Sequence, residues 1–295
     1  MPSPPETVRL AAVADLHCTK TAPGALAALF EEVGGKADVL LLGGDLTDYG
    51  LPEEAKVLAG GHSIVPLMRL RFARPSALVD INPVRELDYV VVEDGRLRIG
   101  AMTRHVDLHT NPLVRENLPL LAEIAGEVGD NQVRNMGTMG GVVAHADSAG
   151  DYPTLALMLD AEIVTNKRRF AAKEFFVALM TTPLEQDELV CEVVFPVARG
   201  PHKYLKFRRR LFDWAIVAAG AQQVDGGWRI GLTNCGPTAV RCAAVEQALA
   251  SGATVEEAAQ KASDGLSPSS DLRASSEYKL HLARVLTRRA IEQAG

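Results

Sequence analysis

Apolar and polar positions along this chain predict a mixed series of strands and helices. Near the N-terminus, two short apolar runs at residues 8–14 and 38–43 flank a stretch with helical periodicity at residues 25–33. Short apolar runs that end in glycine or a carboxylate are typical of buried strands, while apolar residues spaced three or four apart are typical of helices. This order of strand, helix and strand predicts a βαβ unit with parallel strands.

The same criteria predict a longer mixed series after residue 55. The expected strands are residues 56–59, 77–81, 89–93, 97–100, 162–166, 188–195, 203–209, 218–224 and 228–232. The expected helices are residues 117–128, 152–159, 240–250, 254–262 and 275–294, with a Gly-rich loop at 132–141 and a Ser-rich linker at 263–276. Strands and helices mixed in this way predict an α+β fold.

Residues 52–59 allow two interpretations. Pro52-Glu53-Glu54 suits the first turn of a helix, whereas residues 56–59 suit a strand that leads into Gly60-Gly61. Helix propensity over four residues is worth about 1 kcal/mol or less, so pairing in a sheet should prevail. We therefore expect residues 56–59 to be extended with Val57-Leu58-Ala59 fully buried, and residues 52–54 to form at most a short turn.

Two loops centred on glycine pairs, residues 59–63 and 135–141, carry the main chemical signal. Each presents consecutive backbone N–H groups with no Cβ atoms to obstruct a ligand, which suits a pyrophosphate. Two such loops on one chain predict one ligand whose diphosphate is held from both sides.

Composition narrows the class of protein. The chain has 295 residues, 47% of them hydrophobic, and a formal net charge of −6, which argues against general nucleic-acid binding. The four cysteines are scattered without a CxxC pair, so no iron–sulfur cluster or structural zinc site is expected; Cys235 and Cys242 should be buried thiols in a reducing, cytoplasmic compartment. We also expect no signal peptide and no membrane span, and we expect neither His105 nor His109 to bind metal.

A possible metal site lies near the N-terminus. Asp15, His17 and Asp45 are placed at the ends of the two predicted parallel strands, where they could hold a pair of divalent cations. The stretches 14–17 and 44–48 resemble the DxH and GDxxD motifs of calcineurin-like metallophosphoesterases. The later histidine-containing motifs of that family are missing, so we expect residues 1–53 to serve as a packing unit, with phosphoesterase activity as the alternative.

The rest of the chain, about four-fifths of it, resembles another family. The stretches that carry this resemblance are residues 59–68, 78–81, 99–105, 134–141, 144–147 with Asp151 and Pro153, and 206–215. They resemble the FAD-binding medium subunit of molybdenum hydroxylases, of the carbon monoxide dehydrogenase type. The resemblance implies a two-lobed FAD-binding domain of the PCMH type at residues 54–197 and a smaller α/β domain at 198–295.

The resemblance also implies individual roles. The residues it places at FAD are Ala59, Gly60, Gly61, His62, Ser63, Ile64, Thr103, Thr138, Gly140, Gly141, Asp151, Lys206 and Trp214. Both loops would bind the diphosphate, Asp151 the ribityl chain, and Trp214 would lie against the flavin, whose charge Lys206 could influence. Residues 206–210 also fit a solvated strand edge, and Val142 stands where the family commonly has Asn.

The implied function is electron transfer through FAD, from a partner's iron–sulfur clusters to an external acceptor. The implied partners are a large subunit with the molybdenum cofactor and a small iron–sulfur subunit, since this chain has no residues suited to either group. A chain that folds but binds neither cofactor well is a further alternative.

Overall fold

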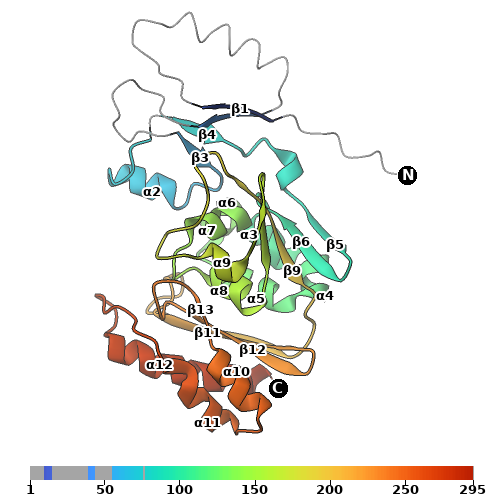
Figure 1. The fold of residues 1–295 in the computed structure, drawn as a ribbon. Helices are drawn as coiled ribbons and strands as arrows, with labels where there is room; N and C mark the ends of the chain where they lie inside the picture. The colour runs from blue at the N-terminus through green and yellow to red at the C-terminus, as the bar shows by residue number, and fades with distance from the viewer. Residues whose placement is uncertain (1–9, 15–38, 44–54, 76, 295) are drawn as a thin grey trace, which may run out of the picture. The chain divides into compact units, whose positions relative to one another are not determined.

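The structure is a computed structural model that describes residues 10–14, 39–43, 55–75 and 77–294. By internal contacts the chain divides into two compact units, residues 1–86 with 184–189 and residues 87–183 with 190–295. Figure 1 shows the order of the elements along the chain. Among the described residues, no helix is both long and apolar enough to cross a membrane.

The first unit contains two small parallel sheets. Strand β1 (Leu10–Ala14) pairs with β2 (Val39–Gly43), which confirms the predicted parallel pair. Strand β3 (Lys56–Leu58) pairs with β4 (Leu78–Asp80), and helix α2 (Ile64–Arg69) lies between them in sequence. The prediction of an extended segment before Gly60 is thus confirmed for residues 56–58. The prediction that Val57, Leu58 and Ala59 are fully buried is wrong, because Val57 is 40% exposed and Leu58 and Ala59 are only partly buried.

The second unit begins with a five-stranded antiparallel sheet in the order β5-β6-β9-β7-β8. Its strands are β5 (Val90–Glu93), β6 (Arg96–Gly100), β7 (Glu162–Thr165), β8 (Arg169–Ala171) and β9 (Val190–Pro196). A short 3-10 helix, η1 (Arg85–Leu87), precedes the sheet. Strand β9 is central and largely buried, as its run of valines and phenylalanine predicts.

Seven helices in the described chain follow or interrupt this sheet. They are α3 (His105–Thr110), α4 (Pro112–Asn117), α5 (Pro119–Glu127), α6 (Asn131–Met136), α7 (Met139–His145), α8 (Asp151–Met158) and α9 (Ala172–Phe175). The prediction of a loop at 132–141 was wrong. Asp130 caps α6 by accepting from the amide of Val133, and Thr138 caps α7, so two short helices form where composition alone favours a loop.

A second sheet, β10-β11-β12-β13, is also antiparallel and leads to the C-terminal helices. The elements are β10 (His202–Phe207), β11 (Val217–Val224), β12 (Gly227–Thr233), β13 (Val240–Arg241), α10 (Ala243–Ala250), α11 (Val255–Gln260), η2 (Lys261–Ser263) and α12 (Ser276–Ala294). The predicted helix at 240–250 starts late, because Val240 and Arg241 pair with β12 instead.

The two faces of this sheet pack differently. One face carries Ala219, Ala221, Ile230 and Leu232, which form an apolar core with side chains of α10, α11 and α12. The opposite face packs on α8, where Gly220 and Gly231 stand opposite each other on β11 and β12. A Cβ on Gly231 would lie 2.9 Å from Thr154 Cγ2 and 3.1 Å from Met158 Cβ. The glycine pair therefore lets α8 approach the sheet closely.

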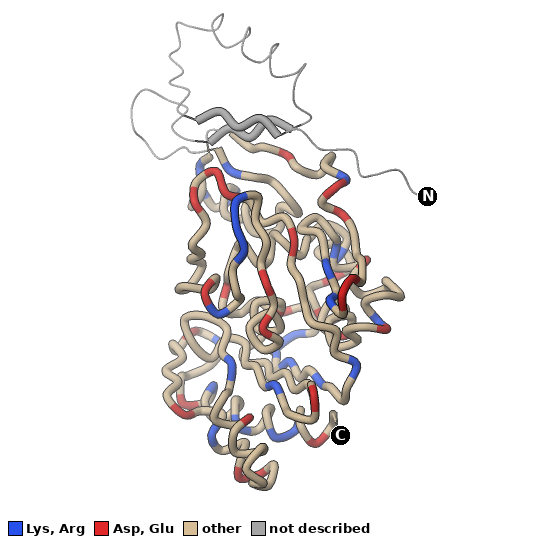
Figure 2. Tube along the Cα trace, turned by 45° about the vertical axis from the view of Figure 1, so that its right-hand side comes forward, with Lys and Arg blue, Asp and Glu red and all other residues tan. Residues whose placement is uncertain are grey.

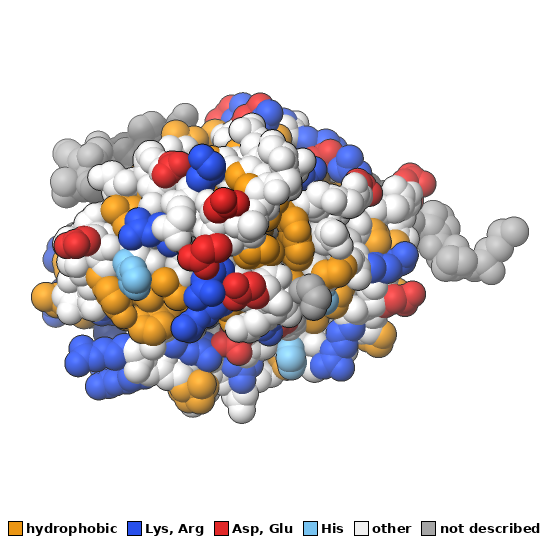
Figure 3. Space-filling view, turned by 90° about the horizontal axis from the view of Figure 1, so that it is seen from below, with side chains coloured by type: hydrophobic (Ala, Val, Ile, Leu, Met, Phe, Trp, Pro, Cys, Tyr) orange, Lys and Arg blue, Asp and Glu red, His pale blue; other side chains and the backbone are white. Residues whose placement is uncertain are grey.

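Charged residues of both signs are interspersed along the described chain (Figure 2). The view of the molecule from below shows the same mixture, with charged side chains of both signs around several apolar areas (Figure 3). Such a surface offers no single extended basic face on the side drawn.

The contact between α8 and the second sheet gives a first prediction. Gly231→Ala should lower the free energy of unfolding by about 1–3 kcal/mol, because the new methyl group overpacks a tight contact. Gly227→Ala on the same strand is the matched control, since its Cβ would meet nothing nearer than Val224 O at 3.7 Å. Urea unfolding of the full chain measures both, and equal stabilities for the two variants would contradict the packing described above.

Candidate functional site

The glycine segment at residues 137–141 comprises the link between α6 and α7, residues 137–138, and the first turn of α7, residues 139–141. Thr138 is the N-cap of α7, and its Oγ1 accepts a hydrogen bond of 3.2 Å from the amide of Gly141. A hydroxyl that accepts in this way keeps its own hydrogen for another partner. Thr138 is 1% exposed, and it holds the first turn of α7 while the hydrogen of its own hydroxyl has no acceptor among the described residues.

The backbone amides of this loop already have partners inside the protein. The amide of Met139 donates to Thr103 O at 3.0 Å, and the amide of Gly140 donates to Ala101 O at 2.8 Å. Gly140 also has a packing reason to be glycine, because a Cβ there would lie 2.5 Å from the Cβ of Ala101. In this arrangement the loop can offer an anion the Thr138 hydroxyl more readily than the amides of residues 139–141.

Thr103 holds the loop to the first sheet of this unit. Its hydroxyl donates to Tyr89 O at 3.0 Å and its carbonyl accepts from Met139, so both polar groups serve the protein. The side chain is 2% exposed. Thr103 therefore uses its carbonyl and the hydrogen of its hydroxyl to fix the position of the loop, and its predicted contact with FAD stays a prediction.

The other glycine loop, residues 59–63, lies in the first unit between β3 and α2. Gly61 has a φ of +75°, a left-handed conformation that other residues adopt only with strain. Among the residues that the structure describes, none accepts a hydrogen bond from the amides of residues 60–63. Asn82 steadies the loop through a 3.0 Å bond from Nδ2 to Ala59 O. This loop has the donors that the sequence led us to expect.

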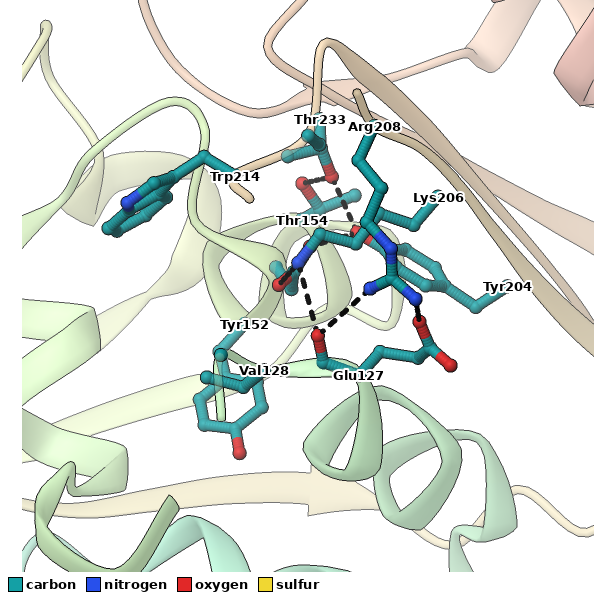
Figure 4. A network of polar contacts seen from close by, with 12 residues as sticks. Glu127, Val128, Tyr152, Thr154, Tyr204, Lys206, Arg208, Trp214 and Thr233 are labelled. Atoms are coloured by element: carbon teal, nitrogen blue, oxygen red, sulfur yellow. Dashed lines mark hydrogen bonds and ion pairs between the residues drawn. The ribbon is translucent and has the colours of Figure 1, made fainter. Parts of the chain in front are cut away.

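A buried ion pair stands at the start of α8. Lys206 Nζ on β10 lies 2.7 Å from Asp151 Oδ2, and the two side chains are 4% and 6% exposed. Figure 4 shows the polar network around this pair. The structure therefore brings together two predicted site residues that are far apart in the sequence, and it pairs them with each other.

The other carboxylate oxygen of Asp151 accepts a hydrogen bond from a tyrosine. Tyr204 OH on β10 donates to Asp151 Oδ1 at 2.7 Å and also lies 2.9 Å from Thr233 Oγ1 on β12. Thr233 Oγ1 in turn lies 2.7 Å from Thr154 Oγ1 on α8. Burial, followed by the charge of Asp151, raises the pKa of Tyr204 well above its ordinary value. Tyr204 therefore stays a neutral donor across the physiological range.

Two cations of the second sheet meet the C-terminal end of α5. Lys206 Nζ and Arg208 Nη1 each lie 3.4 Å from Glu127 O, the carbonyl of the last residue of the helix. Arg208 Nη2 also pairs with Glu127 Oε2 at 2.6 Å. Positive charge at a helix C-terminus is favourable because the unpaired carbonyls there carry partial negative charge. Lys206 and Arg208 are thus partnered groups rather than a solvated strand edge.

Trp214 follows β10 on a segment with several exposed apolar side chains. Its side chain is 50% exposed, and the neighbouring Leu211 and Phe212 are 63% and 57% exposed. Trp214 O lies within 3.5 Å of Arg273 Nη1. Figure 4 shows the indole lying apart from the ion-pair network. An exposed indole of this kind is available to stack on a planar ligand.

The histidines and cysteines have structural roles. His105 is 1% exposed, and its Nδ1 lies 3.0 Å from Tyr152 OH; His109 Nδ1 lies 2.9 Å from Ala122 O. Cys235 and Cys242 are buried free thiols, as predicted. Within the described chain, no group of three His, Cys, Asp or Glu side chains could hold a metal ion. Asp15, His17 and Asp45 lie outside the described residues, so their predicted metal site stays a prediction.

The sequence prediction missed Thr154, Tyr204, Arg208 and Thr233. One signal could have found two of them, because residues two apart in a strand point to the same face. Tyr204, Lys206 and Arg208 follow this spacing, so a role for Lys206 could have suggested its neighbours. Thr154 and Thr233 have no such signal, since their hydroxyls meet only after the second sheet packs on α8.

Two family models match successive parts of the chain. Residues 46–198 match the family model described as the FAD binding domain in molybdopterin dehydrogenase, and residues 202–294 match the C-terminal domain of the CO dehydrogenase flavoprotein. The chain is 39% identical to the carbon monoxide dehydrogenase medium chain of Hydrogenophaga pseudoflava, over 83% of this chain and 90% of that protein. It is 36% identical to the 6-hydroxypseudooxynicotine dehydrogenase complex subunit alpha of Paenarthrobacter nicotinovorans, over 84% and 89%.

Solved structures agree with this assignment. A chain of carbon monoxide dehydrogenase from Hydrogenophaga pseudoflava superposes with a TM-score of 0.77 at 35% identity, over 97% of each chain. A chain of quinoline 2-oxidoreductase from Pseudomonas putida also gives a TM-score of 0.77, at 28% identity, over 97% of this chain and 96% of that one. The chain therefore belongs to the family of FAD-binding medium subunits of molybdenum hydroxylases, an oxidoreductase family that includes carbon monoxide dehydrogenase.

Proposed function

We propose that this chain carries electrons through FAD between a small iron–sulfur subunit and an external acceptor, in a complex whose large subunit holds the molybdenum cofactor. The names of its relatives support this assembly, since they are called a medium chain and a complex subunit, and one solved relative is a Cu,Mo-CO dehydrogenase. Bound FAD supplies the redox chemistry, because its isoalloxazine ring takes up and releases electrons. The chain's own residues bind the cofactor and set its surroundings.

The observation that carries the proposal is the loop at residues 59–63. A left-handed Gly61 and the amides of 60–63, which have no acceptor among the described residues, form a set of donors of the kind a diphosphate needs. Ser63 is the N-cap of α2, and its side chain makes no capping bond, so its hydroxyl is also available to donate. We assign the FAD diphosphate to Ala59, Gly60, Gly61, His62, Ser63 and Ile64.

Residues of the second unit fit other parts of FAD. Each oxygen of Asp151 accepts one bond from the protein, and an ionised carboxylate has about four acceptor positions, so a ribityl hydroxyl can still donate to it. We assign Thr138 to the diphosphate, with Gly140 and Gly141 as the turn that positions it. Trp214 is assigned to stack against the flavin. The charge of Lys206 is largely balanced by Asp151, so we assign it to hold this carboxylate.

Other parts of the sequence interpretation stay proposals. These are the division of the chain into domains after residues 53 and 197, the cytoplasmic location, and the likeness of residues 1–53 to metallophosphoesterases. The family match begins at residue 46, and no observation favours phosphoesterase chemistry.

The loop assignment leads to a second prediction. Gly61→Ala should weaken FAD binding about tenfold or more, since an alanine at positive φ costs about 1–2 kcal/mol and displaces the amides from their positions. Gly226→Ala is the matched control, because Gly226 has a φ of +78° in a turn between β11 and β12 with open space around it. Titration of the apoprotein with FAD, followed by flavin fluorescence, measures both variants. A Gly61→Ala variant with wild-type affinity would refute the assignment of this loop.

The ion pair leads to a third prediction. Lys206→Met should lower the free energy of unfolding of the apoprotein by about 3–5 kcal/mol, because it leaves Asp151 buried without its cation. The double variant Lys206→Met/Asp151→Leu should regain part of that loss, since it removes both charges. Lys203→Met on the same strand is the control, because its ion pair with Glu123 is about one-third exposed. Additive losses in the double variant, measured by urea unfolding, would show that Lys206 and Asp151 do not interact.

A further inference from the structure

A chain of three hydroxyl groups connects the N-terminal turn of α8 to the second sheet and back again. It runs from Thr154 Oγ1 to Thr233 Oγ1 at 2.7 Å, from Thr233 Oγ1 to Tyr204 OH at 2.9 Å, and from Tyr204 OH to Asp151 Oδ1 at 2.7 Å. Thr154, Thr233 and Tyr204 are 1%, 0% and 4% exposed. This series of hydrogen bonds starts and ends on the same helix, because Asp151 and Thr154 both belong to α8.

The direction of each hydrogen bond follows from the carboxylate. Ionised Asp151 can only accept, so the single hydrogen of Tyr204 OH must point to it. Tyr204 oxygen can then only accept from Thr233, which uses the hydrogen of the Thr233 hydroxyl. Thr233 oxygen in turn accepts from Thr154. All three hydroxyls therefore point toward Asp151, and bonds aligned in this way polarise one another in a buried site.

We propose that Tyr204 and Thr233 are positioning residues for FAD, which hold the Asp151 carboxylate at the angle that the cofactor requires. This inference rests on the proposed function, because it assumes that Asp151 contacts FAD. Lys206 holds one oxygen of the carboxylate and Tyr204 the other, so two side chains of β10 fix its plane. The C-terminal part of the chain thereby determines a contact made by the FAD-binding part.

The arrangement predicts what happens when one hydroxyl is lost. Without Thr233 Oγ1, the Tyr204 oxygen loses its donor, so the hydrogen bond from Tyr204 to Asp151 Oδ1 is less polarised and holds the carboxylate less firmly. A shift of the carboxylate changes both the contact with FAD and the field that it exerts on the flavin. FAD affinity and the midpoint potential of the bound flavin should therefore change together, although neither Thr233 nor Tyr204 needs to touch the cofactor.

The test uses the full chain and FAD itself. Thr233→Val and Tyr204→Phe should each weaken FAD binding about tenfold, the order of one lost hydrogen bond, and should shift the midpoint potential measured by dye equilibration. Thr233→Ser restores the hydroxyl and should bind FAD within about twofold of the wild type. Thr287→Val is the matched control, because Thr287 Oγ1 on α12 is buried with no hydrogen-bond partner in the described structure. This control should bind FAD as the wild type does.

The outcomes separate this inference from the proposed function. If the wild type binds FAD and both Thr233→Val and Tyr204→Phe keep its affinity and potential, the positioning role is wrong and the proposed function stands. If Thr233→Ser binds as poorly as Thr233→Val, the effect is one of packing and the inference is also wrong. If the wild type itself does not bind FAD, both proposals fail. Circular dichroism identifies a variant that does not fold, in which case the folded member of the pair Thr233→Val and Tyr204→Phe decides.

Discussion

Burial of the Asp151 charge is the constraint on which the second unit of this protein depends. A carboxylate that is 6% exposed must have a cation and hydrogen-bond donors, since an unpaired charge in a protein interior is very costly. Lys206 and Tyr204 supply these partners, and both come from β10. The second sheet must therefore pack on the start of α8. The opposed glycines Gly220 and Gly231 make that close approach possible.

The two glycine loops have similar sequences and different physical reasons for their glycines. Gly61 has a left-handed backbone, and the amides of its loop have no acceptor within the described residues. Gly140 instead has an amide that donates to Ala101, and it is glycine because a side chain would collide with that residue. A glycine pair alone therefore does not identify a phosphate-binding loop. The hydrogen bonds of its amides distinguish a loop that offers donors from one that has used them.

Local pattern predicted most strands of the second unit and its helices α5, α8, α10, α11 and α12, but not the short helices α6 and α7 or the site network. Strands such as β9 and β11 follow from short runs of buried apolar residues. Helices α6 and α7 were missed because the glycines of residues 132–141 favoured a loop in the prediction. The N-caps Asp130 and Thr138, which start these two helices, were not taken into account. Asp151 and Lys206 were predicted separately as site residues, yet their pairing depends on tertiary packing between α8 and β10. Thr154 and Thr233 could not be predicted from the sequence, because their hydroxyl groups come together only when α8 packs on β12.

The central claim is that the C-terminal sheet and the FAD-binding region act as one unit through Asp151. In a Trp214→Phe variant, which removes the indole assigned to the flavin, Trp228 is the one remaining tryptophan and reports on the C-terminal part, whereas release of FAD reports on the other. Thermal unfolding followed by tryptophan fluorescence at increasing FAD concentration compares them directly. The account predicts that both signals change at one midpoint, which rises with FAD because the ligand binds only the folded state. A tryptophan transition that stays at the same temperature while FAD release moves would contradict it.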